Sequence, residues 1–166
     1  KQLAGMPWVK DGITKDELAA LKYFNILSQQ SRPLARSLAA LRWTNDGVSQ
    51  RESQTLEHLA FIAMEEPSSA HAIAGFSWFI DGLNTDEFAV LGDLKALATQ
   101  DLFLLQNLTR SNWVIKSPSG DGRQALRTIK NLSLRDKSLA RYVTSYAWAG
   151  EDISTHESYA MNSINE

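Results

Sequence analysis

The chain has 166 residues, of which 43% are hydrophobic, with a formal net charge of −2 and no cysteine. This length and apolar content suit one compact domain or one short repeat array. The small net charge excludes a general attraction to nucleic acid or anionic membrane, and the absence of cysteine excludes disulfide and thiolate chemistry. No apolar run reaches the roughly 18 residues that would suggest a membrane span. Lys1 is not an initiator methionine, so we expect the chain to be part of a longer protein.

Tryptophan recurs at a fixed period along the chain. Each of the five tryptophans lies 35 residues after the previous one, and other residues recur in the same phase. The tryptophans are Trp8, Trp43, Trp78, Trp113 and Trp148. A fixed period of this length is typical of a helical repeat array. We therefore divide residues 1–166 into a single array of copies at approximately 6–40, 41–75, 76–110 and 111–145, with a partial fifth copy at 146–166.

The first helix of each copy is predicted to start just after the tryptophan turn. In the first copy, Thr14 and Glu17 have the spacing of a capping box, in which each side chain accepts from the other residue's backbone N–H. Gly12 suits the left-handed conformation that often ends a helix. Ile13 is expected to pack on Leu18 as a hydrophobic staple. Apolar residues then recur at three-residue spacing, which predicts a helix of about 15 residues with one buried face.

A second, shorter helix is expected in each copy. A break near Gln30–Pro33 separates the two helices of the first copy, and Pro33 and Pro67 suit the first turn of the helix that follows. Apolar residues continue up to the next tryptophan, which predicts about 11 residues with the tryptophan near the end of the helix. Two such helices cannot bury their apolar faces alone, so neighbouring copies must stack. The predicted fold is all-α: an α-solenoid of about four to five stacked two-helix repeats.

The turn of the fourth copy departs from the pattern. Lys116, Ser117 and Pro118 replace Asp, Gly and the apolar residue, and Gly122 replaces the capping Glu. The helix is therefore expected to begin a few residues late, with Asp121 as an alternative cap. Two interpretations stay open. The loop is either part of a decayed repeat or a segment released from its structural role to contact a partner.

The fourth copy is also the most basic. Residues 111–145 carry seven basic and two acidic side chains, whereas the second and third copies each carry two basic and five acidic ones. Arg123, Arg127 and Lys130 are spaced to share one helix face, and together with Lys116 they are the candidate binding residues for phosphate or an acidic protein surface. The alternatives are a solvated helix face and charge pairing with the neighbouring acidic copies.

No catalytic or metal-binding motif is found. The loop Asp and the capping Glu of each copy lack the closely spaced oxygen ligands of a calcium loop. His156 and Glu157 resemble the start of a zinc-protease helix, but Ala160 stands where the second histidine is required. His58 and His71 fall in different predicted helices without a ligand pattern. We therefore predict a non-enzymatic protein with no catalytic residue, no metal site and no cofactor.

The tryptophans and the fifth copy each allow two interpretations. The tryptophans could form a stacking surface for sugars or bases, but their fixed place beside the turn favours packing between copies. The fifth copy has one predicted helix, in which Met161 and Ile164 continue the apolar series. This copy either caps the array or stops in the middle of a repeat.

The motif W-x-x-D-G-[ILV]-[TSN]-x-x-E at a period of 35 resembles tandem helical-hairpin repeats of uncharacterised bacterial proteins. The resemblance covers residues 6–166 and implies a fold but no activity. Tetratricopeptide repeats are excluded because their period is about 34 and their core residues differ. Pentatricopeptide repeats share the period but not the rest of the pattern. The resemblance and the lack of thiols favour a bacterial extracytoplasmic setting, although a chain without cysteine fits either side of a bacterial membrane.

These features predict a helical-repeat module that binds a protein or peptide partner and belongs to a larger chain. The recurring residues all have structural roles, so the variable faces are left for recognition. Two alternatives stay open. One is nucleic-acid binding through the basic fourth copy, and the other is an accessory domain of a bacterial enzyme.

Overall fold

The computed structural model describes residues 7–10, 12–116, 118, 120–146 and 153–165, and every regular element in them is an α-helix. The all-α prediction is confirmed. Long helices of 16 residues recur at 35-residue intervals: α2 (Lys15–Gln30), α5 (Gln50–Glu65), α8 (Thr85–Gln100) and α11 (Gly120–Arg135). Shorter helices follow them: α3 (Arg32–Leu38), α6 (Pro67–Ala74), α9 (Leu102–Leu108) and α12 (Lys137–Thr144).

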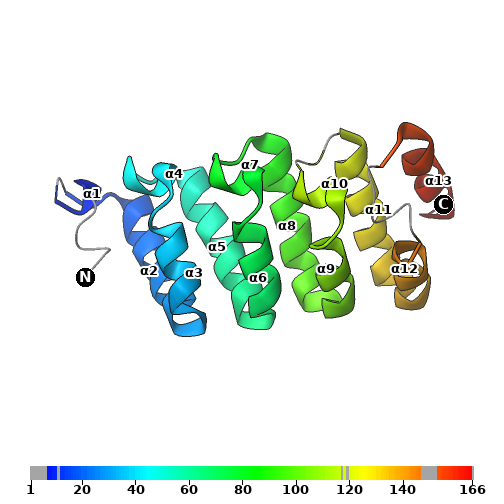
Figure 1. Cartoon of the computed structure of the whole chain (residues 1–166), viewed down its shortest axis with the longest axis horizontal. Helices are drawn as coiled ribbons and strands as arrows, with labels where there is room; N and C mark the ends of the chain where they lie inside the picture. Colours follow the sequence, from blue (N-terminus) through cyan, green and yellow to red (C-terminus); the bar gives the residue numbers. More distant parts are fainter. Residues whose placement is uncertain (1–6, 11, 117, 119, 147–152, 166) are drawn as a thin grey trace.

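The long helices lie side by side in chain order (Figure 1). α2 packs against α5, α5 against α8, α8 against α11, and α11 against α13 (Thr155–Asn165). Each shorter helix packs on the long helix that precedes it, so the shorter helices form a second layer, with α3 next to α6 and α9 next to α12. The order of the helices in space therefore follows their order in the sequence, and neighbours in the row are neighbouring copies.

The long helices α2, α5 and α8 begin at hydrogen-bonded caps. The side chains of Thr14, Ser49 and Asn84 each accept from the backbone N–H three residues later. The carboxylate of the Glu at that position accepts from the backbone N–H of the cap residue. The glycines of the preceding turns have positive φ values of 105°, 108° and 92°, a conformation that glycine adopts without a steric penalty. They are Gly12, Gly47 and Gly82. The predicted caps and left-handed glycines are confirmed.

The predicted staple between Ile13 and Leu18 does not bury either residue. Ile13 is 45% exposed and Leu18 is 63% exposed. The buried face of α2 runs through Ala20, Phe24 and Leu27. Because successive residues of an α-helix are turned by about 100°, Leu18 points away from this face. Ile13 and Leu18 therefore lie outside the buried face of α2, and the start of this helix is held by its capping box.

The second helices are shorter than predicted. They have seven or eight residues and end before the tryptophan, which lies instead in a separate four-residue helix: α1 (Pro7–Lys10), α4 (Arg42–Asn45), α7 (Ser77–Ile80) and α10 (Asn112–Ile115). Between α3 and α4, Leu41 is extended with ψ of 145°. This bend redirects the chain. The Thr44 hydroxyl donates to the carbonyl oxygens of Leu38 and Leu41 at the bend.

The redirected tryptophans bridge neighbouring copies. In three copies the indole N–H donates to a backbone carbonyl oxygen 36 residues later, at 2.8, 3.1 and 2.8 Å. The pairs are Trp8 with Thr44, Trp43 with Phe79 and Trp78 with Val114. These indoles and that of Trp113 are buried, so the packing interpretation is confirmed for the four, while Trp148 lies outside the described residues. A buried tryptophan that satisfies its N–H stabilises both by apolar burial and by polar pairing.

The long helix of the fourth copy does not begin late. α11 starts at Gly120, 35 residues after the start of α8 at Thr85. Leu126 and Ile129 are buried in α11, and their packing fixes the helix in phase with its neighbours although the local turn residues differ. Asp121 lies in the first turn and accepts from the Thr155 hydroxyl of α13 at 2.9 Å. The predicted loop residue Ser117 lies outside the described residues.

Candidate functional site

Two of the four predicted binding residues face the third copy. The Arg123 guanidinium forms an ion pair with Asp86, and the Lys130 ammonium forms one with Asp93. The Lys130 and Asp93 side chains are only 21% and 16% exposed. These basic residues are therefore used in charge pairing between neighbouring copies, which is one of the two alternatives that the sequence left open for them.

The other two predicted residues are exposed in different elements. Arg127 lies on α11 between Arg123 and Lys130, and Lys116 lies at the C-cap of α10 in the turn before α11. The structure thus pairs Arg123 and Lys130 on the α8 side and leaves Lys116 and Arg127 exposed at separate places. An anion would have to displace an Asp from Arg123 or Lys130 to use all four residues.

An ion pair between a buried carboxylate and a half-exposed arginine, which sequence reasoning missed, joins the same two copies. The Asp101 side chain is fully buried, and its carboxylate accepts from the Arg141 guanidinium at 2.8 and 3.1 Å. Asp101 is also the N-cap of α9 and accepts from the N–H groups of Phe103 and Leu104. Burial raises the pKa of the Asp101 carboxyl, but the bonds from Arg141 and the two N–H groups outweigh this effect and hold the pKa below its ordinary value.

The Asp101–Arg141 pair belongs to a recurring contact. The N-cap side chains of α3, α6 and α9 are each hydrogen-bonded to a side chain 40 residues later, on the shorter helix of the next copy. The pairs are Ser31 with His71, Glu66 with Gln106, and Asp101 with Arg141. Their residue types differ from copy to copy, which is why the sequence pattern did not show them. A polar side chain at the N-cap with a second one 40 residues later is the signal that identifies them.

The capping Glu of the first copy also reaches the next copy. The Glu17 carboxylate accepts from the N–H and hydroxyl of Thr14, at 2.8 and 2.9 Å. It also accepts from the backbone N–H of Val48. These bonds hold the pKa of Glu17 below its ordinary value despite burial, and the bond from the Thr14 backbone N–H has the largest effect. The acidic turn is thus a joint within one copy and a contact to the next.

A histidine is enclosed between the second and third copies. The His58 ring stacks on Phe88 of α8 with centroids 5.2 Å apart, and its Nδ1 is buried without a hydrogen-bond partner among the described residues. Burial lowers the pKa of His58, and the nearby Lys95 ammonium lowers it further against the opposing effect of Glu57. The neutral ring is therefore the form that this interface accommodates.

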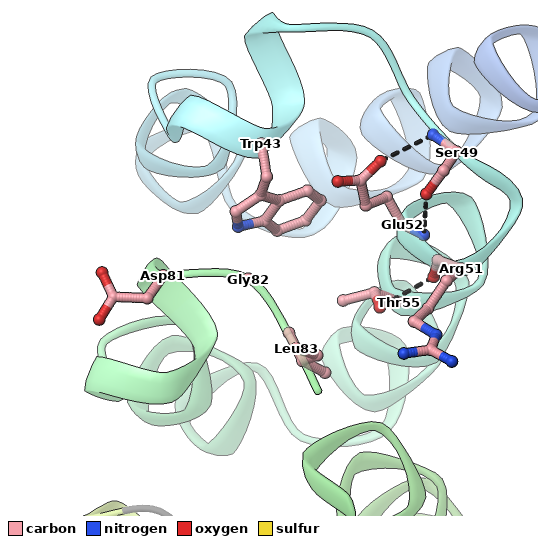
Figure 2. A pocket seen from close by; sticks show the side chains of 8 residues that line it. All are labelled: Trp43, Ser49, Arg51, Glu52, Thr55, Asp81, Gly82 and Leu83. Carbon is pink, nitrogen blue, oxygen red and sulfur yellow. Dashed lines mark hydrogen bonds between the residues drawn. The ribbon is translucent and has the colours of Figure 1, made fainter. Parts of the chain in front are cut away.

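An open groove lies between the turns of the second and third copies (Figure 2). Its volume is about 190 Å³, and it is lined by Trp43, Ser49, Arg51, Glu52, Thr55, Asp81, Gly82 and Leu83. An adjoining hollow of about 430 Å³ shares Trp43, Glu52 and Asp81 and extends to Arg42 and Asp46. Figure 2 shows the Trp43 indole beside Glu52, with the Asp81–Leu83 segment opposite.

The groove combines an apolar floor with both signs of charge. Trp43 and Leu83 supply apolar surface, while Arg51, Glu52 and Asp81 supply charged groups. This combination suits a peptide or protein side chain, which needs apolar contact together with a few polar anchors.

Within the part of the chain that the structure describes, no group of three or more His, Asp or Glu side chains is placed to hold a metal ion.

Comparison with protein-family models, curated proteins and solved structures finds no match to this chain. Among the described residues, no helix combines the length and the apolar character needed to cross a membrane.

Proposed function

We propose that this chain is an α-solenoid of stacked two-helix repeats that has no enzymatic activity of its own and binds a protein or peptide partner as part of a larger chain. The observation that carries the proposal is the groove between the second and third copies. The residues that recur in the turns of the first three copies are used for folding: the indole packs, the glycine turns the chain and the Glu caps a helix. Recognition then falls to residues that do not recur.

Two lining residues of the groove depart from their counterparts in the other copies. Arg51 stands where the first, third and fourth copies have an aspartate, and Thr55 stands where they have alanine or valine. Arg51 is exposed and borders Glu52 and Thr55. An arginine at the edge of a groove that is also lined by Trp43 and Leu83 favours a peptide segment that carries both an acidic and an apolar residue.

The test is selection of linear peptides from a phage-displayed library against the whole chain. We expect enriched peptides to lose about tenfold in affinity with Arg51→Asp, which restores the residue of the other copies, because one charged anchor is reversed. Arg110→Asp is the matched control, since Arg110 is an exposed arginine outside the groove. Failure to enrich any peptide, or turnover of substrates in a broad hydrolase screen, would contradict the proposed function.

The nucleic-acid alternative receives less support. Arg123 and Lys130 are already paired with acidic residues, which leaves few of the predicted cations for phosphate. Binding of nucleic acid by phosphate contacts strengthens steeply as salt is lowered. We expect no salt-dependent binding of DNA or RNA at low ionic strength, measured by fluorescence anisotropy, and such binding would favour the alternative.

A further inference from the structure

A small cavity lies between α6 and α9, the shorter helices of the second and third copies. Its volume is about 90 Å³, and it is lined by Ser68, Ser69, Ala72, Gln106, Thr109 and Arg110. The Gln106 amide donates to the Glu66 carboxylate at 2.7 Å and so joins the two helices beside the cavity. One water molecule needs about 10–15 Å³ of such a space. The cavity therefore has room for a group of a few non-hydrogen atoms.

The cavity lies where a serine replaces a leucine of the repeat. Ser69 stands at the position that Leu34, Leu104 and Leu139 occupy in the first, third and fourth copies. Leu34 and Leu104 are buried in the core. Because a serine side chain is smaller than that of leucine, it leaves space that an apolar side chain fills in the other copies.

The Ser69 hydroxyl is buried without a partner. Ser69 is only 2% exposed, and its Oγ makes no hydrogen bond among the described residues. A serine or threonine within a helix can donate to the carbonyl oxygen four residues earlier, as Thr55 does to Arg51, but Ser69 does not. A buried hydroxyl group without a partner costs free energy. A bound group that accepts from Ser69 would remove this cost.

A cation borders the same cavity. The Arg110 side chain forms no ion pair or hydrogen bond with the part of the chain that the structure describes. It stands where the other copies have Ala40, Gly75 and Ser145. The hydroxyl of Ser69 and the guanidinium of Arg110 thus each depart from the repeat, and both line one cavity. Their common feature is that they donate hydrogen bonds, so they suit an anionic acceptor.

Glu66 limits the charge of that anion. Its carboxylate accepts from the Ser68 hydroxyl and from the Gln106 amide, and these bonds, together with backbone N–H groups, hold the pKa of Glu66 below its ordinary value despite burial. Glu66 is therefore negatively charged at neutral pH. Arg110 balances one further negative charge, whereas a dianion such as phosphate would be repelled by Glu66. A group with a single negative charge fits this balance.

We propose that the cavity between α6 and α9 binds a carboxylate group, which accepts from the Ser69 hydroxyl and from the Arg110 guanidinium. The planar guanidinium matches the two oxygens of a carboxylate, and such charge-assisted bonds are stronger than neutral ones. The carboxylate belongs to a small organic acid or to an acidic side chain of a partner, since both offer the same chemistry. This site is separate from the groove at Trp43 and goes beyond the proposed function.

The test is an NMR titration of the whole chain, labelled with ¹⁵N, with sodium acetate at constant ionic strength. We expect saturable amide shifts centred on Ser69, Thr109 and Arg110. Acetamide has a similar shape without the charge and should bind about tenfold more weakly. Arg110→Ala, which introduces the residue of the first copy, should weaken acetate binding about tenfold. Arg36→Ala is the matched control, because Arg36 is exposed on α3 outside the cavity.

Ser69→Leu separates binding from folding. Leucine is the residue of the other copies, so we expect it to fill the cavity and to weaken acetate binding about tenfold or more. The same variant should raise the thermal midpoint, because it buries apolar surface in place of an unpaired hydroxyl. If the larger side chain instead lowers the midpoint, Arg110→Ala still decides the question, since Arg110 is exposed.

Two short peptides, blocked at both ends, identify the source of the carboxylate. One carries a glutamate between alanines, and the other carries a glutamine in its place. If the glutamate peptide binds more tightly than acetate and shifts the same amides, the group belongs to a partner. If acetate binds more tightly, the group belongs to a small acid.

Three results would overturn the inference. They are no saturable shift at Ser69 and Arg110 with either acetate or the glutamate peptide, equal or tighter binding of acetamide or inorganic phosphate, and unchanged acetate affinity in Arg110→Ala. Arg51→Asp should leave acetate binding unchanged, because Arg51 lines the separate groove. A failure at the cavity therefore leaves the peptide selection at the groove as an independent test of the proposed function.

Discussion

Asp101 and Arg141 are held together by two hydrogen bonds at the boundary between the third and fourth copies, with the carboxylate fully buried. We expect Asp101→Asn to lower the free energy of unfolding by about 1–3 kcal/mol, because the amide keeps the helix cap but loses the charge-assisted bonds to the guanidinium. Asp136→Asn makes the same change at the equivalent cap and should be neutral. Urea unfolding of both variants checks this, and equal effects would contradict it.

Acid should weaken the contacts between copies. The folded-state pKa values of Asp101 and Glu17 lie below their ordinary values. Their stabilisation is therefore fully present above the unfolded-state values of about 4 and is lost as the pH falls through the lower folded-state values. The free energy of unfolding, measured between pH 7 and pH 3, should fall in this range. The fall should be smaller in Asp101→Asn, and an unchanged profile would contradict the assignment.

His58 should make stability depend on pH at a higher range. Burial lowers the folded-state pKa of His58, so the neutral ring stabilises the fold above about pH 6.5, and this contribution is lost as the pH falls toward the folded-state pKa. His58→Phe keeps an aromatic ring against Phe88 and should flatten the thermal midpoint between pH 7 and pH 5. His156→Phe, at an exposed position, should keep the natural profile. A natural profile in His58→Phe would exclude His58 as the cause.

The buried indoles give a prediction about stacking between copies. Trp78→Phe removes the bond from the indole N–H to the Val114 carbonyl oxygen and leaves a buried acceptor unpaired. We expect a loss of about 1–3 kcal/mol in the free energy of unfolding, plus the effect of the smaller ring. Denaturant unfolding followed by circular dichroism measures it. The exposed Phe103, when replaced by Leu, should cost much less; comparable losses would count against the role of Trp78.

The two parts of the basic surface should respond differently to charge reversal. Lys130→Glu places a carboxylate beside Asp93 in a largely buried contact and should cost about 1–3 kcal/mol of stability. Arg127→Glu, on the same helix but exposed, should leave stability nearly unchanged. Thermal unfolding of the two variants at low salt makes the comparison. A larger effect from Arg127→Glu would contradict the pairing that the structure assigns to Lys130.

Some features of the fold were predictable because they depend on neighbouring residues. The capping boxes at Thr14, Ser49 and Asn84 and the left-handed Gly47 follow from hydrogen bonds and torsion angles within a few residues. The late start expected for α11 was wrong because the burial of Leu126 and Ile129 keeps the helix in phase with its neighbours, although the turn residues near Pro118 differ. The burial of Ile13 and Leu18 was not predictable because capping patterns do not specify which side of the first turn is solvated.

The candidate site was less predictable. The sequence placed Arg123, Arg127 and Lys130 on one helix but did not distinguish paired from exposed cations. It also did not identify the groove beside Arg51, since the opposite wall is the Asp81–Leu83 turn, some 30 residues further along the chain. Recognition surfaces of this kind depend on the distance between copies.

The sequence by itself determined the helical class, the 35-residue phase and the starts of α2, α5 and α8, because periodicity, caps and glycine conformations are local properties. Only the tertiary structure decided where the shorter helices break, which carbonyl each indole reaches and which acids pair with Arg123, Lys130 and Arg141. Those contacts join residues 36 to 40 positions apart. They exist because adjacent helices pack at a definite offset, which no local pattern encodes.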